Sequence, residues 1–270
     1  MTFSRRARVI FASVAAIALA FIYAPLVVVL VNSFNVSKVF SWPPRRFTLS
    51  WWDKALVNHG VREAVLTSVK AGLGATAIAL VLGSTFAAAV VRYHWFGRDA
   101  LSLVVILPIA LPGIVTGIAL NSAFRTVLVP LGISFGLFTV VLGHATFCIV
   151  VVFNNIAARL RRTGSSLQEA SMDLGASSWQ TFRFVTLPAV RSALVAGALL
   201  AFALSFDEIV VTSFTAGPGI QTLPQWIFNN LFRPNQAPIV NAVAAALVVL
   251  FVIPVYLAQR LSEGGSGGRI

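Results

Sequence analysis

The sequence predicts an all-α protein that crosses a membrane with six helices, and three observations predict it. Of its 270 residues, 58% are hydrophobic and only 10% are charged, whereas roughly 25% are charged in an ordinary soluble domain. Twenty basic and eight acidic residues are too few to cover a soluble protein of 28.8 kDa. Long stretches also carry no charge at all, and an α-helix needs about 20 apolar residues to cross a bilayer.

Six predominantly apolar stretches follow one another along the chain. The first, Val9–Val31, comes after Arg5, Arg6 and Arg8. A signal peptide is the rival interpretation, but its apolar region covers only about 7–15 residues, so we expect a retained span. The predicted spans are 9–31, 64–91, 101–124, 136–156, 192–212 and 238–258. The segments between them are too short for a separate soluble domain, so residues 1–270 are expected to form one membrane domain.

The third span contains Pro108, Pro112, Gly113 and Gly117. These residues predict a kinked or interrupted helix, which a membrane tolerates only where the freed backbone groups face protein or a water-filled cavity. This span is therefore a candidate element of a transport pathway.

Basic residues orient the spans. With the N-terminus in the cytoplasm, more Lys and Arg lie on the cytoplasmic side than outside, which predicts that both termini are cytoplasmic. The net charge of +12 is then explained by this topology and by attraction to anionic lipid headgroups, so no nucleic-acid partner is expected.

The sequence offers no catalytic, cofactor-binding or metal motif. A P-loop needs Lys directly after Gly, and none of the lysines follows a glycine. There is no His-Glu-x-x-His motif and no Gly-x-Ser-x-Gly elbow. We therefore expect no enzymatic activity and no cofactor, and energy-consuming work would need a nucleotide-binding partner chain.

The predicted cytoplasmic loop, residues 159–188, is the most informative segment. Capping boxes of Ser166 with Glu169, or of Ser165 with Gln168, predict a short helix from about Leu167 to Leu174. Gly175 is placed to end this helix in the left-handed conformation.

A second short helix and the next span are expected after Gly175. Ser177 or Ser178 can cap the second helix, and Pro188 suits the first turn of the span.

The first loop helix has two distinct faces. Leu167, Ala170 and Leu174 share one face by their i, i+3, i+4 spacing, and Glu169 and Asp173 are i, i+4 neighbours on another. The loop is thus either a docking surface or merely an amphipathic connection.

The spacing in this loop resembles the EAA signature of ABC-importer permeases. Glu169-Ala170-Ser171 is followed by three residues, Gly175, nine residues and Val185-Thr186-Leu187-Pro188. The family signature reads Glu-Ala-Ala, three residues, Gly, nine residues, Ile-x-Leu-Pro, so Ser171 and Val185 are mild departures. The resemblance implies a type I importer (MetI-like) bundle in which Glu169, Ala170, Asp173 and Gly175 belong to a helix that couples to a cytoplasmic ATPase.

Four further segments resemble the polyamine branch of these permeases, and in particular the second permease of spermidine/putrescine-type importers. They are Asn32-Ser33-Phe34-Asn35, Gly143–Cys148, Asp173–Ala176 and Leu204–Val211. The resemblance implies a second homologous permease subunit, two copies of an ATP-binding subunit, an extracytoplasmic solute-binding protein and a location in the bacterial inner membrane.

Asp207 and Glu208 lie within the predicted fifth span. An ionised side chain at the centre of a membrane helix costs about 2.5–3.5 kcal/mol on insertion scales, so acids there are expected to be paired or functional. We predict that Asp207 or Glu208 lines a path for an amine cation, with Phe206 offering an aromatic face. The alternative is a structural ion pair or interhelical hydrogen bond.

These features predict the permease subunit of an ATP-driven importer that moves polyamines by alternating access. An importer for another small organic solute is the nearest alternative. A stand-alone channel or secondary transporter would not need the loop that resembles an ATPase-docking segment.

Overall fold

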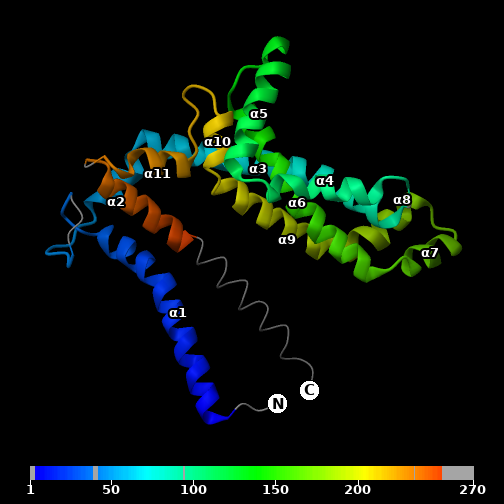
Figure 1. Ribbon diagram of the computed structural model, residues 1–270, viewed down its shortest axis with the longest axis horizontal. Helices are drawn as coiled ribbons and strands as arrows, with labels where there is room; N and C mark the ends of the chain where they lie inside the picture. Colours follow the sequence, from blue (N-terminus) through cyan, green and yellow to red (C-terminus); the bar gives the residue numbers. More distant parts are fainter. Residues whose placement is uncertain (1–3, 39–41, 94, 234, 251–270) are drawn as a thin grey trace. The chain divides into compact units, whose positions relative to one another are not determined.

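The computed structural model describes residues 4–38, 42–93, 95–233 and 235–250, and it is helical in nearly all of its regular structure (Figure 1). The elements are α1 (Arg5–Asn32), α2 (Ser50–Val57), α3 (His59–Arg92), α4 (Arg98–Ala110), α5 (Gly113–Val127), η1 (Val129–Leu131), α6 (Leu137–Thr163), α7 (Ser166–Asp173), α8 (Ser178–Thr181), η2 (Phe182–Thr186), α9 (Leu187–Phe206), α10 (Val210–Thr215) and α11 (Leu223–Leu231). A further apolar helix covers Ala237–Leu250.

Five helices in the described ranges are long and apolar enough to cross a membrane. Four of them correspond to the predicted spans 9–31, 64–91, 136–156 and 192–212, although the fifth predicted span has different bounds, as shown below. The predicted span 101–124 is interrupted at Leu111 and Pro112, between α4 and α5, which confirms the break expected from its prolines and glycines. Of the sixth predicted span, the part beyond Leu250 lies outside the described residues.

The chain divides into two compact units. The first comprises the described parts of 1–62 and 227–270, and it holds α1 and α2. The Trp51 indole N–H donates to the Asn35 carbonyl at 2.9 Å, and the Asn35 side-chain amide donates to Asn32 Oδ1 at 3.0 Å. These bonds tie the end of α1 to α2, whereas the apolar length of α1 is exposed, as expected for a helix whose surroundings are lipid or partner helices.

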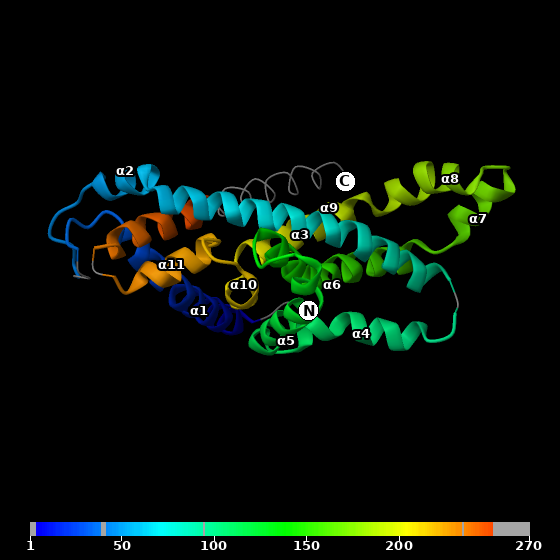
Figure 2. The same cartoon turned by 90° about the horizontal axis from the view of Figure 1, so that it is seen from above.

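The second unit, Glu63–Trp226, is built around α6. Helices α6 and α9 pack along each other (Figures 1 and 2). Helix α3 presents small residues at four-residue intervals, and Ala71, Ala75 and Ala79 are fully buried. A Cβ on Gly83 would lie 2.9 Å from the Ile149 carbonyl oxygen. Small side chains therefore let α3 approach α6 closely, as is common between membrane helices.

Candidate functional site

The loop between α6 and α9 folds into the two short helices that the sequence predicts, α7 and α8. Gly175 has φ +86°, in the left-handed region, directly after the end of α7. The Ala176 N–H donates to the Ser171 carbonyl at 3.1 Å, and the Gly175 N–H donates to the Met172 carbonyl at 2.9 Å. This pair of bonds is the Schellman motif, so the predicted role of Gly175 as a helix terminator is confirmed.

The predicted capping boxes at the start of α7 are wrong. Ser165 occupies the N-cap position, but its backbone is already helical and its side chain makes no capping bond; an N-cap residue needs an extended backbone to bring its side chain onto the first turn. A capping box forms instead at α8. Ser177 Oγ accepts from the Gln180 N–H at 3.3 Å, and Gln180 Oε1 accepts from the Ser177 N–H at 2.7 Å.

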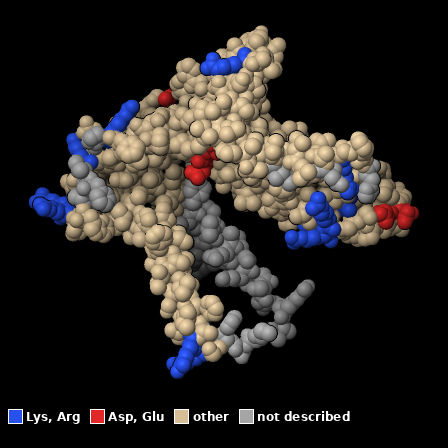
Figure 3. Space-filling view, viewed as in Figure 1, with Lys and Arg blue, Asp and Glu red and all other residues tan. Residues whose placement is uncertain are grey.

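The surface of α7 is open. Leu167 is 58% exposed and Leu174 is 90% exposed, and Ala170 between them is exposed too. Glu169 and Asp173 are also exposed, and acidic side chains are visible at the end of the view where Figure 1 places α7 (Figure 3). The apolar and acidic faces predicted from the spacing are therefore both available to a partner.

Two side-chain bonds hold α7 against the following helices. The Gln168 amide donates to Thr186 Oγ1 at 2.6 Å, and Ser171 Oγ lies 3.1 Å from Thr181 Oγ1. Helix α8 then continues through the π-helical turn η2 into α9, so that the helix runs unbroken over Ser178–Phe206. A displacement of α7 would therefore act directly on the fifth membrane helix.

The predicted end of that fifth span, at Thr212, is wrong. The continuous helix begins at Ser178 in α8, and it ends at Phe206 rather than Thr212. Asp207 is the C-cap of α9, and a new helix, α10, starts at Val210. The two acids therefore lie in a break between helices and not inside one helix.

The break gives the two acids different surroundings. Asp207 is exposed, whereas Glu208 is partly buried and its Oε1 accepts from the Val211 N–H at 2.8 Å. Glu208 thus satisfies one of the free N–H groups at the start of α10. Phe206, expected to face the pathway, is 7% exposed and its ring centroid lies 5.8 Å from that of Phe202.

His144 on α6 bridges this break. Its Nδ1 lies 2.7 Å from Ser205 Oγ in the last turn of α9, and its Nε2 lies 2.9 Å from Thr212 Oγ1 in α10. All three side chains are buried. Thr212 Oγ1 also donates to the Glu208 carbonyl at 3.0 Å.

The hydroxyl of Thr212 has one hydrogen, and that hydrogen goes to Glu208. Thr212 must therefore accept from an N–H at Nε2 of His144, which leaves Nδ1 to accept from Ser205. The neutral Nε2–H tautomer satisfies every member of this network. No local sequence pattern identifies Ser205 and Thr212 as the partners of His144.

Helix α10 is also held from its other side by α5. Gly117 faces Phe214 so closely that a Cβ on Gly117 would clash with the phenyl ring. The Asn121 amide donates to the Phe214 carbonyl at 2.5 Å, and Thr139 Oγ1 on α6 donates to the Thr215 carbonyl at 2.7 Å. The interrupted third span and the broken fifth span therefore meet at α10.

Comparison with known proteins identifies the family. Residues 61–264 match the model of the family described as the inner membrane component of binding-protein-dependent transport systems. The chain belongs to this family. It is a multi-pass inner-membrane permease of an ABC importer, a class of subunit that has no catalytic activity of its own.

Several relatives resemble the permease over nearly its whole length. The spermidine/putrescine transport system permease protein PotC of Haemophilus influenzae is 34% identical over 90% of this chain and 93% of the relative. The putrescine transport system permease protein PotI of Escherichia coli K12 is 33% identical over 93% and 89%. PhnV of Salmonella paratyphi A, named as a 2-aminoethylphosphonate transport system permease, is 32% identical over 90% and 89%.

Two solved structures share the fold. A bacterial ABC transporter involved in alginate import matches with a TM-score of 0.72 and 15% identity over 98% of this chain and 99% of that one. The MetNI methionine transporter matches with a TM-score of 0.57 and 21% identity over 83% and 99%. The predicted MetI-like bundle is thus confirmed at the level of the fold, and the sides of the membrane on which the termini lie stay a prediction.

Proposed function

We propose that this permease moves polyamines such as spermidine or putrescine into the cytoplasm by alternating access. The observation that carries the proposal is an exposed acid, Asp207, at a break in a membrane helix. A polyamine brings several positive charges into low-dielectric surroundings, where each charge needs a counter-charge. The similarity to PotC and PotI over about nine tenths of the chain supports the same solute class.

The two acids have different roles in this proposal. Asp207 is free to meet an ammonium group, whereas Glu208 keeps α10 in place through the Val211 N–H. Phe206, packed on Phe202, supports the break and does not contact the solute. Asp207→Asn removes one negative charge while it keeps the shape of the side chain, so uptake of putrescine should fall strongly with a raised KM.

The acid experiment has an internal comparison. Glu208→Gln retains an oxygen that can accept from Val211, so the protein should fold normally with a smaller loss of uptake than Asp207→Asn. Normal uptake in both variants would end the proposed pathway role for these acids.

The proposed coupling contact is α7. Its exposed Leu167, Ala170 and Leu174 would enter a groove on an ATP-binding subunit, with Glu169 and Asp173 at the edge. Because α7 is bonded to Thr186 and Thr181, closure of the ATPase subunits would move the fifth membrane helix. Glu169→Arg should abolish solute-stimulated ATP hydrolysis while membrane insertion stays normal; normal transport by this variant would contradict the coupling role.

The proposed assembly contains a second homologous permease, two copies of the ATP-binding subunit, an extracytoplasmic solute-binding protein and the surrounding lipid. Both termini and the α7 loop would face the cytoplasm. Purification through this chain, followed by identification of the bound subunits, tests the composition. Uptake by the permease alone in liposomes would instead support a channel or secondary transporter.

An importer for another small organic solute is the second candidate, favoured by the 32% identity to the 2-aminoethylphosphonate permease. Uptake of labelled putrescine by cells that express the whole transporter separates the two candidates. Unlabelled spermidine should compete with putrescine, and 2-aminoethylphosphonate should not. The reverse order of competition would favour the second candidate.

A further inference from the structure

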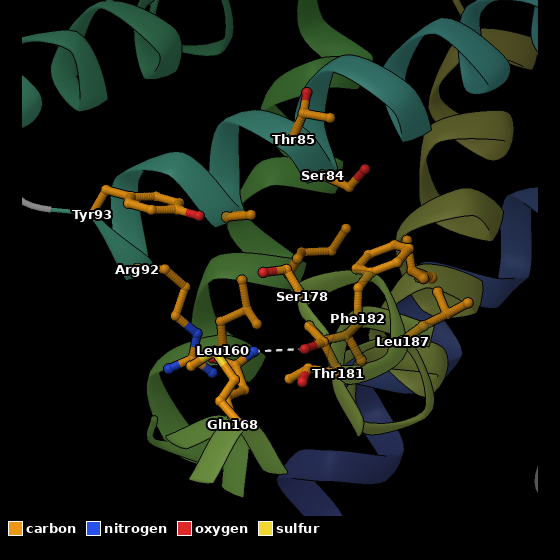
Figure 4. A pocket seen from close by; sticks show the side chains of 16 residues that line it. Ser84, Thr85, Arg92, Tyr93, Leu160, Gln168, Ser178, Thr181, Phe182 and Leu187 are labelled. Carbon is orange, nitrogen blue, oxygen red and sulfur yellow. Dashed lines mark hydrogen bonds between the residues drawn. The ribbon is translucent and has the colours of Figure 1, made fainter. Parts of the chain in front are cut away.

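A pocket of about 370 Å³ lies within the second unit, beside the loop that joins α6 to α9 and contains α7 and α8, here called the coupling loop (Figure 4). Its lining residues come from the last turns of α3, the C-terminal half of α6, α7, α8, η2 and the start of α9. Its volume lies in the range of about 300–1,000 Å³ found for pockets that hold small molecules. The pocket is separate from the helix break at Asp207, and none of its lining residues belongs to that break.

The wall of the pocket is mostly apolar. It includes Ile156 and Leu160 from α6, Met172 from α7, and Leu187 and Val190 from α9. Several lining hydroxyls are already used by neighbours: Thr85 bonds to the Val81 carbonyl, and Thr186 accepts from Gln168. The wall therefore suits a hydrocarbon chain better than a wholly polar ligand.

One lining residue carries a charge. Arg92, in the last turn of α3, extends toward Leu160 and Gln168 (Figure 4). Its Nε is buried and has no hydrogen-bond partner among the described residues, although a buried donor without a partner costs about 1–3 kcal/mol. The described lining contains no Asp or Glu, so the guanidinium has no counter-charge inside the pocket.

The pocket also lies where a membrane would supply its ligand. Arg92 ends a helix that is long and apolar enough to cross the bilayer, so the residue would lie near the level of the lipid headgroups. Basic pockets between membrane helices on the cytoplasmic side bind anionic lipid headgroups. We propose that this pocket binds an anionic phospholipid, with its phosphate on Arg92 and an acyl chain along the apolar wall.

The bound lipid would act as a regulator of coupling. It would contact Met172 and Gln168 of α7 and Thr181 and Phe182 beyond it, so it would join both halves of the coupling loop to the end of α3. The loop would then move with the membrane helices as one body. This site is independent of which solute the permease carries.

Lipid retention tests the site directly. The transporter, purified through this chain with its partner subunits, would be mixed with phosphatidylglycerol or with phosphatidylcholine of the same acyl chains and analysed by native mass spectrometry. Arg92→Gln should weaken phosphatidylglycerol binding about tenfold, the effect of losing one charge-assisted hydrogen bond. Arg92→Lys should retain part of the preference, and Arg162→Gln, an equal change of charge at an exposed residue outside the pocket, should retain all of it.

Three outcomes of the lipid-binding experiments would overturn the proposal. They are equal binding of the two lipids by the wild type, unchanged lipid preference in Arg92→Gln, and full competition by inorganic phosphate, which would mean a soluble anion. A crosslinking experiment with Thr85→Cys adds a fourth. If the cysteine crosslinks to a partner subunit and not to a reagent attached to a lipid, a protein fills the pocket.

A second readout is ATP hydrolysis stimulated by the solute in nanodiscs. Phosphatidylglycerol should raise this activity in the wild type and should have no such effect in Arg92→Gln. This readout rests on the proposed coupling role of α7, whereas lipid retention does not.

Discussion

The imidazole Nε2 of His144 on α6 lies 2.9 Å from the Thr212 hydroxyl oxygen on α10. The same ring reaches Ser205 at the end of α9 through Nδ1. One buried side chain therefore holds both ends of the helix break that contains the two acids. A break of this kind is tolerated at membrane depth only where protein or water satisfies the freed backbone groups, and Thr212 and Glu208 satisfy two of them.

His144→Ala should destabilise the permease and reduce uptake. The substitution leaves the Ser205 and Thr212 hydroxyls without one partner each, at a cost of about 1–3 kcal/mol per buried group. Thermal unfolding of the detergent-purified protein measures the loss. Uptake should fall by a larger factor than the amount of folded permease does, because Asp207 and Glu208 lose their fixed position.

Thr212 offers the matched pair for this network. Thr212→Ser keeps the hydroxyl and should behave nearly as the wild type, whereas Thr212→Val keeps the shape and loses both hydrogen bonds. The double variant His144→Ala with Thr212→Val should be less damaged than the sum of the single effects, because the two groups share one interaction. Strict additivity would contradict the bridge.

Gly117→Ala should displace α10. A Cβ at this position would clash with the ring of Phe214, and overpacking of this kind costs about 1–3 kcal/mol. Gly136→Ala is the control, because Gly136 has an extended backbone and nothing lies within 4 Å of its Cβ position. Unfolding temperatures of the two variants should differ, and equal temperatures would mean that α5 does not pack on α10 as described.

Gly175→Ala should disturb the end of α7. No atom lies within 4 Å of a Cβ there, so the effect comes only from the left-handed backbone, at about 1–2 kcal/mol. Gly175→Asn should be tolerated better, because Asn enters this conformation more readily. Solute-stimulated ATP hydrolysis measures the outcome, and an Ala variant as active as the Asn variant would argue against a fixed loop.

Ser177→Ala should loosen α8, whereas Ser165→Ala should have no effect. Ser177 accepts from the Gln180 N–H, and removal of such a cap costs about 1 kcal/mol. Ser165 makes no side-chain capping bond. Limited proteolysis of the loop should be faster in the Ser177 variant alone; equal rates would place the cap elsewhere.

Much of the fold could be predicted because the signals are local. A span is recognised from uncharged apolar length, which the bilayer requires of a crossing helix. The interruption at Leu111 and Pro112 follows from proline, and the end of α7 follows from the glycine at 175. The amphipathic faces of α7 were also readable, because helical spacing fixes which residues share a face.

The errors arose where two local signals compete. Ser165 and Ser166 both precede acceptable capping partners, and the structure uses neither because the backbone at Ser165 is already helical. The apolar run through residues 192–212 looks continuous, yet the helix ends at Phe206 because Glu208 and Thr212 can start a new one.

The sequence by itself determined the membrane class, the two short helices of the loop before α9 and the identity of the two acids, because hydrophobicity, helical period and spacing are properties of neighbours in the chain. Only the tertiary structure decided what surrounds those acids. His144 meets Ser205 and Thr212 across separations of more than sixty residues, and Arg92 faces a pocket formed by segments from α3 to α9. Contacts of this kind exist only once the helices have packed, so no local sequence pattern predicts them.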